Sequence, residues 1–366
     1  MDEAKIVSDS QLDQNFRAAA FIENNVAWYS PMEKPFHIAG FAWFEQDRTY
    51  RRLPFELPYP IPERVHRLAN HTAGGQIRFQ TDSSFLSVRV KLIGPAYMSH
   101  MSAIAQCGID CYIGDHGEMK FCNASIFEPF DSEYEAVLFQ DFSKEMRNIV
   151  LNLPLYQGVV ELTIGLSTDA QIIEAPPYKS NKKVIIYGTS ITQGGCASRP
   201  GMAYTNILSR KIPYEFINLG FSGQGKGEAE LARTIALIEN PALIVLDYEG
   251  NCVSTELFMQ TLPEFVRIIR ETHPLVPILI PSRIRYPREN LMQRFYDWRT
   301  ERKKFEQELV AERRKNGDHL IFFHDGSEML GETDFHECTV DGSHPTDLGF
   351  IRMADGLEPV YKALLI

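Results

Sequence analysis

The chain has 366 residues, of which 44% are hydrophobic and 23% are charged, and its formal net charge at pH 7 is −11. This length is enough for two domains, and the composition is that of a folded globular protein, which excludes extensive disorder. The acidic balance argues against nucleic acid as a partner, because nucleic-acid binding needs a basic surface.

The sequence contains no apolar run that approaches the roughly 20 residues needed to cross a bilayer, so we expect no membrane association. The first ten residues, MDEAKIVSDS, lack the basic and then apolar stretches of a secretory signal. We therefore expect a cytoplasmic protein, or a secreted one whose signal peptide has been removed.

Residues 1–178 carry the pattern of an all-β domain. Apolar and polar residues alternate in several short stretches, and this period of two indicates half-buried antiparallel strands at 76–79, 85–90, 110–113 and 159–164. Several short strands at this spacing predict a β-sandwich. Four prolines between Pro54 and Pro62 exclude a helix or an interior strand there, so we expect an extended surface segment.

The stretch APPY at 175–178 is the expected boundary, because the pattern changes after it. Five short apolar runs follow, at 184–187, 216–219, 243–246, 278–280 and 320–323. Helix-like segments alternate with these runs near 203–211, 227–239, 255–272, 289–316 and 346–364. This alternation predicts an α/β domain over residues 179–366, with a parallel sheet covered by helices on both faces. In such sheets, ligands bind at the carboxyl ends of the strands.

A serine follows the first apolar run of the second half. Residues 188–194, GTSITQG, place Ser190 in a glycine-bounded turn that can present its hydroxyl at the edge of the sheet. The pattern differs from the G-x-S-x-G elbow of α/β-hydrolases, because Thr192 stands in place of the last glycine. A serine in such a turn is, by itself, also typical of ordinary loop structure.

An aspartate and a histidine precede the last predicted helix. In residues 341–345, DGSHP, Asp341 stands three positions before His344, so one turn can bring its carboxylate to the imidazole. The carboxylate then accepts a hydrogen bond from one ring nitrogen, and the other nitrogen can take a proton from a serine. These residues also fit an ordinary turn.

Two further loops offer hydrogen-bond donors. Residues 218–225, NLGFSGQG, contain Gly223, and residues 248–251, YEGN, end on Asn251. A glycine N–H and an asparagine amide can hold a developing oxyanion. Each loop alone is an ordinary feature, whereas the ordered set of Ser, Gly, Asn and Asp-x-x-His indicates a catalytic site.

In these four blocks the sequence resembles the SGNH hydrolases, also called the GDSL esterase family, over roughly residues 182–366. The resemblance implies a flavodoxin-like three-layer α/β/α domain with a five-stranded parallel sheet. The preceding half resembles the jelly-roll module of two-domain SGNH proteins, which include carbohydrate deacetylases and an acyltransferase-type branch. Thr189 stands where the family usually has aspartate, which leaves the nucleophile in place.

The resemblance implies a serine esterase, a carboxylic ester hydrolase that works through an acyl-enzyme. Ser190 is the expected nucleophile, His344 the base and Asp341 the acid that orients it. The backbone N–H groups of Ser190 and Gly223 and the Asn251 side chain are the expected oxyanion hole.

The expected substrate is a short-chain acyl ester, most simply an acetyl ester, on a small molecule or a carbohydrate. No metal and no cofactor is needed for this chemistry. An acyltransferase with the same triad and a non-catalytic carbohydrate-binding protein are the alternatives. The sequence leaves a homo-oligomer open.

Residues 220–226 suggest a different chemistry, because they fit G-x-x-x-x-G-K between a strand and a helix, as in a phosphate-binding loop. Gly227 follows, where such a loop has Ser or Thr to hold magnesium, so we rank nucleotide binding below the esterase.

The remaining polar features have ordinary explanations. Six cysteines match no recurring zinc pattern, so we expect buried free thiols, with a metal site or disulfide among Cys107, Cys111 and Cys122 as the alternative. We expect a solvated loop cluster of Arg283, Arg285 and Arg288, and an exposed, charge-dense helix face over 301–315.

Overall fold

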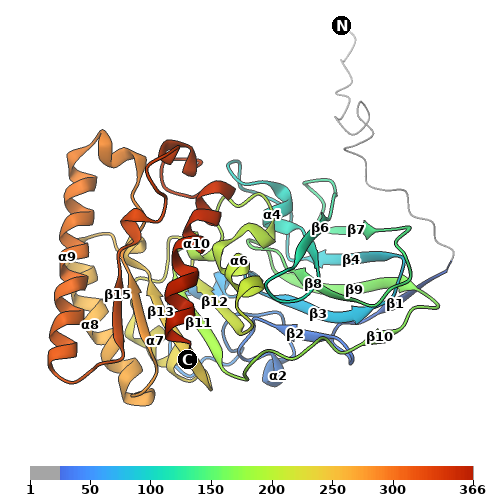
Figure 1. Ribbon diagram of the computed structural model, residues 1–366, viewed down its shortest axis with the longest axis horizontal. Coiled ribbons are helices and arrows are strands. Elements are labelled where there is room, and N and C mark those ends of the chain that lie inside the picture. Colours follow the sequence, from blue (N-terminus) through green and yellow to red (C-terminus); the bar gives the residue numbers. More distant parts are fainter. Residues whose placement is uncertain (1–24, 366) are drawn as a thin grey trace, which may run out of the picture.

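The computed structural model describes residues 25–365, and its two halves lie side by side (Figure 1). The stretch MDEAKIVSDS and the first part of the predicted N-terminal domain lie outside the described residues. No helix among the described residues is both long and apolar enough to cross a bilayer.

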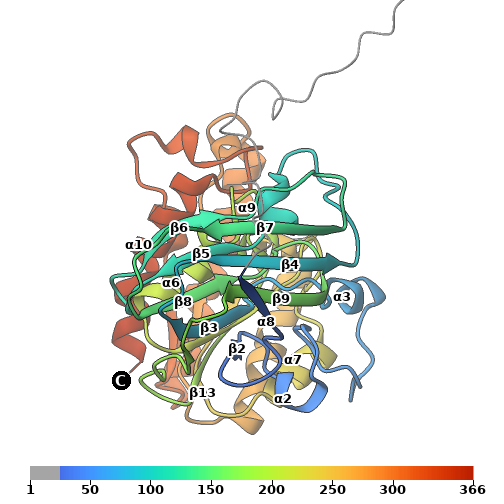
Figure 2. The same cartoon turned by 90° about the vertical axis from the view of Figure 1, so that its right-hand side faces the viewer.

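The N-terminal half contains two antiparallel sheets, which Figure 2 shows from the side. One sheet has the order β1-β9-β4-β7, built from β1 (Val26–Tyr29), β9 (Val159–Ser167), β4 (Leu86–Leu92) and β7 (Glu133–Phe139). The other has the order β10-β3-β8-β5-β6, with β2 (His37–Ala39) also paired to β3; its strands are β10 (Ile172–Ile173), β3 (Gln76–Thr81), β8 (Arg147–Asn152), β5 (Asp110–Ile113) and β6 (Lys120–Ala124).

The inner faces of these two sheets share one apolar core. Ile77 and Phe79 of β3 pack in the same cluster as Val88 of β4 and Ile164 of β9. These residues alternate with outward-facing ones, as the period of two predicts. The β-sandwich is therefore confirmed. Short helices α2 (Phe44–Asp47), α3 (Glu63–Leu68) and α4 (Ala103–Cys107) lie in its connections.

The C-terminal half contains one sheet of five parallel strands. These are β11 (Lys183–Gly188), β12 (Glu215–Gly220), β13 (Pro241–Asp247), β14 (Ile278–Pro281) and β15 (Ile321–His324), in the spatial order β12-β11-β13-β14-β15. Counted within this half, the order is 2-1-3-4-5, which is the flavodoxin-like order. The predicted fold class is therefore confirmed.

Helices cover both faces of the parallel sheet. On one face, α6 (Tyr204–Lys211) and α10 (Asp347–Leu364) pack on Val184 and Ile186. On the other, α7 (Ala229–Ala236), α8 (Thr255–Thr272) and α9 (Gln293–Lys315) pack on Ile185 and Tyr187. Successive residues of β11 thus face opposite layers, which explains why the strand is apolar throughout. The short α5 (Ser190–Gln193) directly follows β11, and 3₁₀ turns lie at Pro200–Met202, Glu249–Asn251, Pro287–Asn290, Gly326–Glu328 and Phe335–Cys338.

The prediction of an exposed helix face over 301–315 is wrong for the charged residues Arg302 and Glu306, and Leu309 and Val310 are buried as well. Arg302 is only 5% exposed and donates hydrogen bonds to the backbone carbonyls of Glu249 and Cys252, at 3.0 and 3.1 Å. Glu306 is fully buried. Local charge density misleads at Arg302 because a long side chain can reach inward to the backbone carbonyls of another segment.

The arginine cluster is also only partly as expected. Arg283 is buried and forms ion pairs with Glu249 at 3.4 Å and Glu289 at 2.6 Å, so its prediction as a solvated residue is wrong. Arg288 is exposed, and its guanidinium donates to the Asp341 backbone carbonyl at 2.7 Å. All six cysteines are free thiols, five of them buried.

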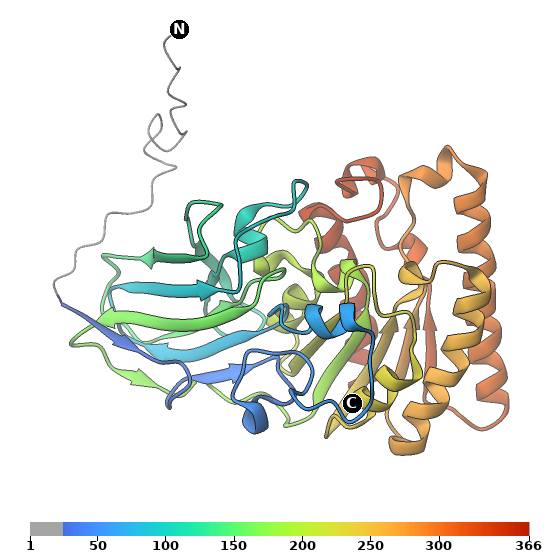
Figure 3. The ribbon, with the colours of Figure 1, turned by 180° about the vertical axis from the view of Figure 1, so that it is seen from behind.

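Arg52 ties the two halves together and is fully buried. Its guanidinium donates to the carbonyls of Leu68 (2.7 Å) and His71 (2.8 Å) in the N-terminal half, and to that of Gly220 (2.5 Å) at the end of β12. Figure 3 shows the blue stretch with the short helix α3 near the junction of the halves. Burial lowers the pKa of Arg52 to about 9, which still leaves the group charged at neutral pH. The N-terminal half therefore helps to position the edge of the parallel sheet.

Candidate active site

The predicted site residues gather at the carboxyl edge of the parallel sheet. Strand β11 ends at Gly188, whose register partners are Gly220 at the end of β12 and Asp247 at the end of β13. Strand β12 lies on one side of β11, and β13 lies on the other. At such a switch point of an open parallel sheet, ligands bind in a crevice at the carboxyl ends of the strands.

Glycine at the ends of β11 and β12 lets the turn that carries Ser190 sit directly on the sheet. A Cβ on Gly188 would lie 2.0 Å from Thr192 Oγ1, and one on Gly220 would lie 2.3 Å from the Gln193 backbone nitrogen. Thr189 caps the short helix α5, because its hydroxyl accepts from the Ile191 N–H at 3.1 Å. Ser190 is thereby held as the first residue of α5.

The structure brings Ser190, His344 and Asp341 into one hydrogen-bonded chain. Ser190 Oγ lies 2.8 Å from His344 Nε2, and His344 Nδ1 lies 2.7 Å from Asp341 Oδ2. The Nδ1–H donates to the carboxylate, so Nε2 keeps a lone pair directed at the serine hydroxyl. This is the arrangement that a serine nucleophile with a histidine base requires.

Both oxygens of Asp341 are used. Oδ2 accepts from the imidazole, while Oδ1 accepts from the backbone N–H groups of Ser343 and His344, at 3.0 and 2.9 Å. Burial alone would raise the pKa of Asp341, but the hydrogen bonds from His344 hold it below its ordinary value. The carboxylate therefore stays ionised while it orients the histidine.

The expected oxyanion donors are not equally available. Gly223 is exposed at a φ of 64°, with open space where a Cβ would point. Among the described residues, the N–H groups of Ser190 and Gly223 donate no backbone hydrogen bond. By contrast, Asn251 Nδ2 donates to the carbonyls of Phe221, at 2.9 Å, and Gln224. Asn251 thus holds the loop that carries Gly223, a contact that the sequence did not predict.

Residues of the N-terminal half form hydrogen bonds to the turn that carries Ser190. The Tyr156 hydroxyl donates to the Ser190 carbonyl at 3.3 Å, and Gln193 Nε2 donates to the Leu155 carbonyl at 3.0 Å and to His71 Nδ1 at 3.1 Å. Gln193 lies inside the first motif, so its proximity to the site could have been predicted. Tyr156 and His71 lie in loops of the other half, where no sequence pattern marks them.

His100 also reaches the site from the N-terminal half. Its ring centroid lies 6.1 Å from that of His344. Within the part of the chain that the structure describes, His100, Cys196 and His344 are the group that could hold a metal ion, with candidate ligand atoms within 4.8 Å of one another. Sequence analysis did not connect these residues.

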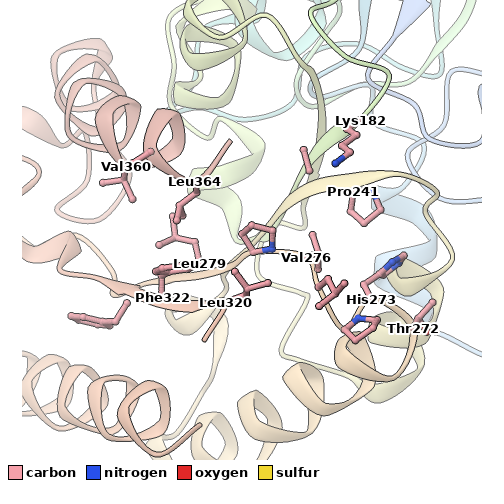
Figure 4. A pocket seen from close by; sticks show the side chains of 16 residues that line it. Lys182, Pro241, Thr272, His273, Val276, Leu279, Leu320, Phe322, Val360 and Leu364 are labelled. Atoms are coloured by element: carbon pink, nitrogen blue, oxygen red, sulfur yellow. The ribbon is translucent and has the colours of Figure 1, made fainter. Parts of the chain in front are cut away.

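A cavity of about 930 Å³ lies away from this site (Figure 4). Pro241, at the start of β13, and Leu279 and Phe322, in β14 and β15, belong to its apolar lining. It opens at the amino edge of the sheet, opposite the edge at which Ser190 lies.

Comparisons with known proteins place the chain in a family. Residues 181–362 match the GDSL-like lipase/acylhydrolase family, and residues 26–172 match the N-terminal module of SGNH-hydrolase-type esterases. The structure of a GDSL-like lipase from Bacteroides ovatus is 32% identical, with a TM-score of 0.85 over 93% of this chain and 98% of that protein. The chain belongs to the GDSL-like lipase/acylhydrolase family. It is an esterase of the SGNH type, and the alternative of a nucleotide-binding enzyme is set aside.

More distant structures share the fold of this GDSL-like esterase. A salicylyl-acyltransferase, SsfX3, from a tetracycline biosynthetic pathway is 21% identical, with a TM-score of 0.72 over 94% of this chain and 98% of that one. A family two carbohydrate esterase from Cellvibrio japonicus is 14% identical, with a TM-score of 0.58 over 93% and 98%. No curated protein matches the sequence.

The buried His71 should make the esterase sensitive to acid. Burial, with a smaller contribution from Arg52, lowers the pKa of His71 from 6.5 to about 3. Between these two pKa values, His71 binds a proton in the unfolded state but not in the folded state. Stability is therefore lost as the pH falls below 6.5. The free energy of unfolding of the parent protein should therefore fall between pH 6.5 and pH 4.5. We expect this fall to be smaller in His71→Gln, by up to about 1.4 kcal/mol per pH unit, measured by urea denaturation.

The exposed His319 provides the matched control for this prediction. His319→Gln should leave the pH dependence unchanged. Equal pH dependence in the His71→Gln variant and the parent protein would contradict the assignment of a buried neutral histidine.

Proposed function

We propose that the protein hydrolyses short acyl esters, above all acetyl esters, with Ser190 as nucleophile, His344 as base and Asp341 as its orienting acid. The observation that supports this proposal is the unbroken chain of hydrogen bonds, at 2.8 and 2.7 Å, that ends on the serine hydroxyl. Such a chain allows the proton to leave the hydroxyl as the oxygen attacks.

The reaction follows from these contacts. Ser190 Oγ attacks the ester carbonyl while His344 Nε2 takes its proton, and Asp341 stabilises the imidazolium that forms. His344 then returns the proton to the leaving alcohol, which leaves an acyl group on Ser190. Water attacks this acyl-enzyme by the same route in reverse and releases the acid.

The oxyanion formed in each step needs donors that point at it. We assign this role to the N–H groups of Ser190 and Gly223, which have no backbone acceptor among the described residues. Asn251 is the proposed third donor, and in this role its amide must release one of the loop carbonyls that it now binds. Removing one such donor typically costs about 10²- to 10³-fold in rate.

A small hollow beside the nucleophile supports a short acyl group. Its volume is about 20 Å³, and its lining includes Thr189 and Ile191, which flank Ser190, together with Gly250 and Tyr286. A space of about one to two water-sized spheres suits a methyl group and excludes a long chain. We therefore propose acetyl as the preferred acyl group.

Two observations bear on which molecule accepts the acyl group and on which alcohol the ester contains. The side chains of His344 and Asp341 are 25% and 35% exposed, so water can reach the acyl-enzyme, as hydrolysis requires. Tyr97, which is 62% exposed, lies three residues before His100 in the loop that reaches the site, where the His100 ring centroid is 6.1 Å from that of His344. An exposed aromatic ring near the site offers a face to a sugar, and the likeness to a family two carbohydrate esterase agrees with a carbohydrate ester.

The nucleophile can be tested with p-nitrophenyl acetate. We expect Ser190→Ala to lower kcat by roughly 10⁴-fold or more while the fold is retained, because no other group supplies the attacking oxygen. Ser132→Ala, in the β-sandwich, is the matched control and should retain full activity. Turnover by Ser190→Ala at the rate of the control would exclude the proposed mechanism.

The acyl preference can be tested at Tyr286. Tyr286→Ala should enlarge the hollow and raise the ratio of kcat/KM for the butyryl ester to that for the acetyl ester by about 10-fold or more, since one or two extra methylenes gain room. Tyr286→Phe keeps the ring and should leave the ratio unchanged. An unaltered ratio in Tyr286→Ala would mean that this hollow does not receive the acyl group.

A further inference from the structure

Three potential metal ligands from three separate segments meet at the catalytic histidine. They are His100 in the N-terminal half, Cys196 after α5, and His344 itself, and their candidate ligand atoms lie within 4.8 Å of one another. The nucleophile, base and acid already described do not require His100 or Cys196. Their convergence therefore calls for a separate explanation.

The loop that carries His100 is held in place by a buried glutamine. Gln106 Oε1 accepts from the N–H groups of Tyr97 and Met98, both at 2.9 Å, and Gln106 Nε2 donates to the Met101 carbonyl at 2.7 Å. Gln106 is only 1% exposed. His100 lies inside this clamped stretch and is itself exposed, so its imidazole is free to bind a ligand at a defined position.

Cys196 lies near His344 in an unusual backbone conformation. Its φ is 71°, a left-handed value that a residue with a Cβ rarely adopts. The preceding Gly195 packs against the imidazole, because a Cβ there would lie 3.2 Å from His344 Cδ2, the atom bonded to Nε2. The segment that carries the thiol is therefore packed against the imidazole, and the candidate ligand atoms of Cys196 and His344 lie within 4.8 Å of each other.

His344 is prepared as a ligand by the same contact that prepares it as a base. Asp341 accepts from Nδ1, which leaves Nε2 as the coordinating nitrogen. A histidine that donates its other N–H to a carboxylate is the usual outer-shell arrangement of protein zinc ligands. Two imidazoles and a thiolate are also a donor set that favours zinc over magnesium or calcium.

The spacing agrees with this chemistry. Zinc lies about 2.0–2.1 Å from histidine nitrogen and about 2.3 Å from thiolate sulfur, so the ligand atoms of a tetrahedral site lie about 3.3–3.8 Å apart. The observed separations of up to 4.8 Å require an approach of about 1 Å, which side-chain rotation of the exposed His100 can supply. Ser190 Oγ or a water molecule completes the coordination.

We propose that His100, Cys196 and His344 form an inhibitory binding site for Zn²⁺. The zinc–sulfur bond forms as the Cys196 thiol releases its proton to solvent. The zinc–nitrogen bond takes the Nε2 lone pair that otherwise accepts the proton of Ser190. The metal is thus no part of the reaction but blocks it, and its removal restores the base. The inhibitory effect rests on the proposed function, whereas metal binding does not.

The test begins with the full-length protein freed of metal by a chelator. ZnCl₂ is titrated against a chromophoric zinc chelator to obtain stoichiometry and affinity, and separately against p-nitrophenyl acetate turnover. We expect one equivalent to bind, turnover to be lost, and EDTA to restore it. In the Co²⁺-loaded protein we expect a thiolate-to-cobalt absorption band.

Variants identify the ligands. His100→Ala and Cys196→Ser should each weaken zinc binding by about 10-fold or more, since loss of a ligand costs at least as much as loss of an outer-shell partner. Zinc should also inhibit each variant less than it inhibits the parent protein, when the turnover of each variant is compared with its own turnover without zinc. Cys196→Ser should also lose the cobalt band. The controls His336→Ala, at an exposed histidine, and Cys122→Ser, in the sandwich, should bind zinc like the parent protein.

The zinc-binding measurement distinguishes a failure of the proposed zinc site from a failure of the proposed esterase function. Zinc binding by a parent protein that shows no esterase activity would uphold the site and overturn the proposed function. Esterase activity with no zinc binding, or with equal binding in His100→Ala and Cys196→Ser, would overturn the site and leave the proposed function intact.

Discussion

The hydrogen bond between Ser190 Oγ and His344 Nε2, 2.8 Å long, joins residues 154 positions apart. The parallel sheet makes this contact available, because its strands all end at one edge. Strand β11 delivers Ser190 to that edge, and the loop before α10 returns His344 to it. Asp341 uses one oxygen to shape this loop and the other to hold the imidazole. The geometry of the site therefore follows from strand order together with one short turn.

The β-sandwich is part of the foundation of this site rather than a separate attachment. Arg52 reaches from the N-terminal half to the end of β12, and Tyr156 reaches the carbonyl of Ser190 itself. Gly201 N–H donates to the buried Asp110 of β5 at 2.6 Å, which joins the segment after α5 to the sandwich as well. Buried polar contacts of this kind hold two halves in one defined arrangement, because each unpaired group would carry a desolvation cost.

The sequence predicted the β-sandwich, the parallel-sheet domain and the candidate triad because their signals are local. Strand alternation and fully apolar runs record how many faces of a strand are buried. The serine after a strand and the Asp-x-x-His pattern before the last helix, with the family resemblance, indicated Ser190 and His344. Other features depend on distant partners and carry no such signal. The burial of Arg302 depends on carbonyls in the turn after β13, and the place of His100 depends on how the two halves dock. Asn251 was predicted as a donor, but its bonds to the Gly223 loop follow from backbone geometry that the sequence does not express.

The activation of Ser190 by His344 can be measured most directly with a fluorophosphonate. The serine oxygen displaces fluoride and forms a stable bond to phosphorus, so intact mass and peptide mapping identify the nucleophile. We expect a single adduct on Ser190 in the parent protein and strongly slowed labelling in His344→Ala. An adduct on a different serine, or equal labelling rates in the two proteins, would contradict it.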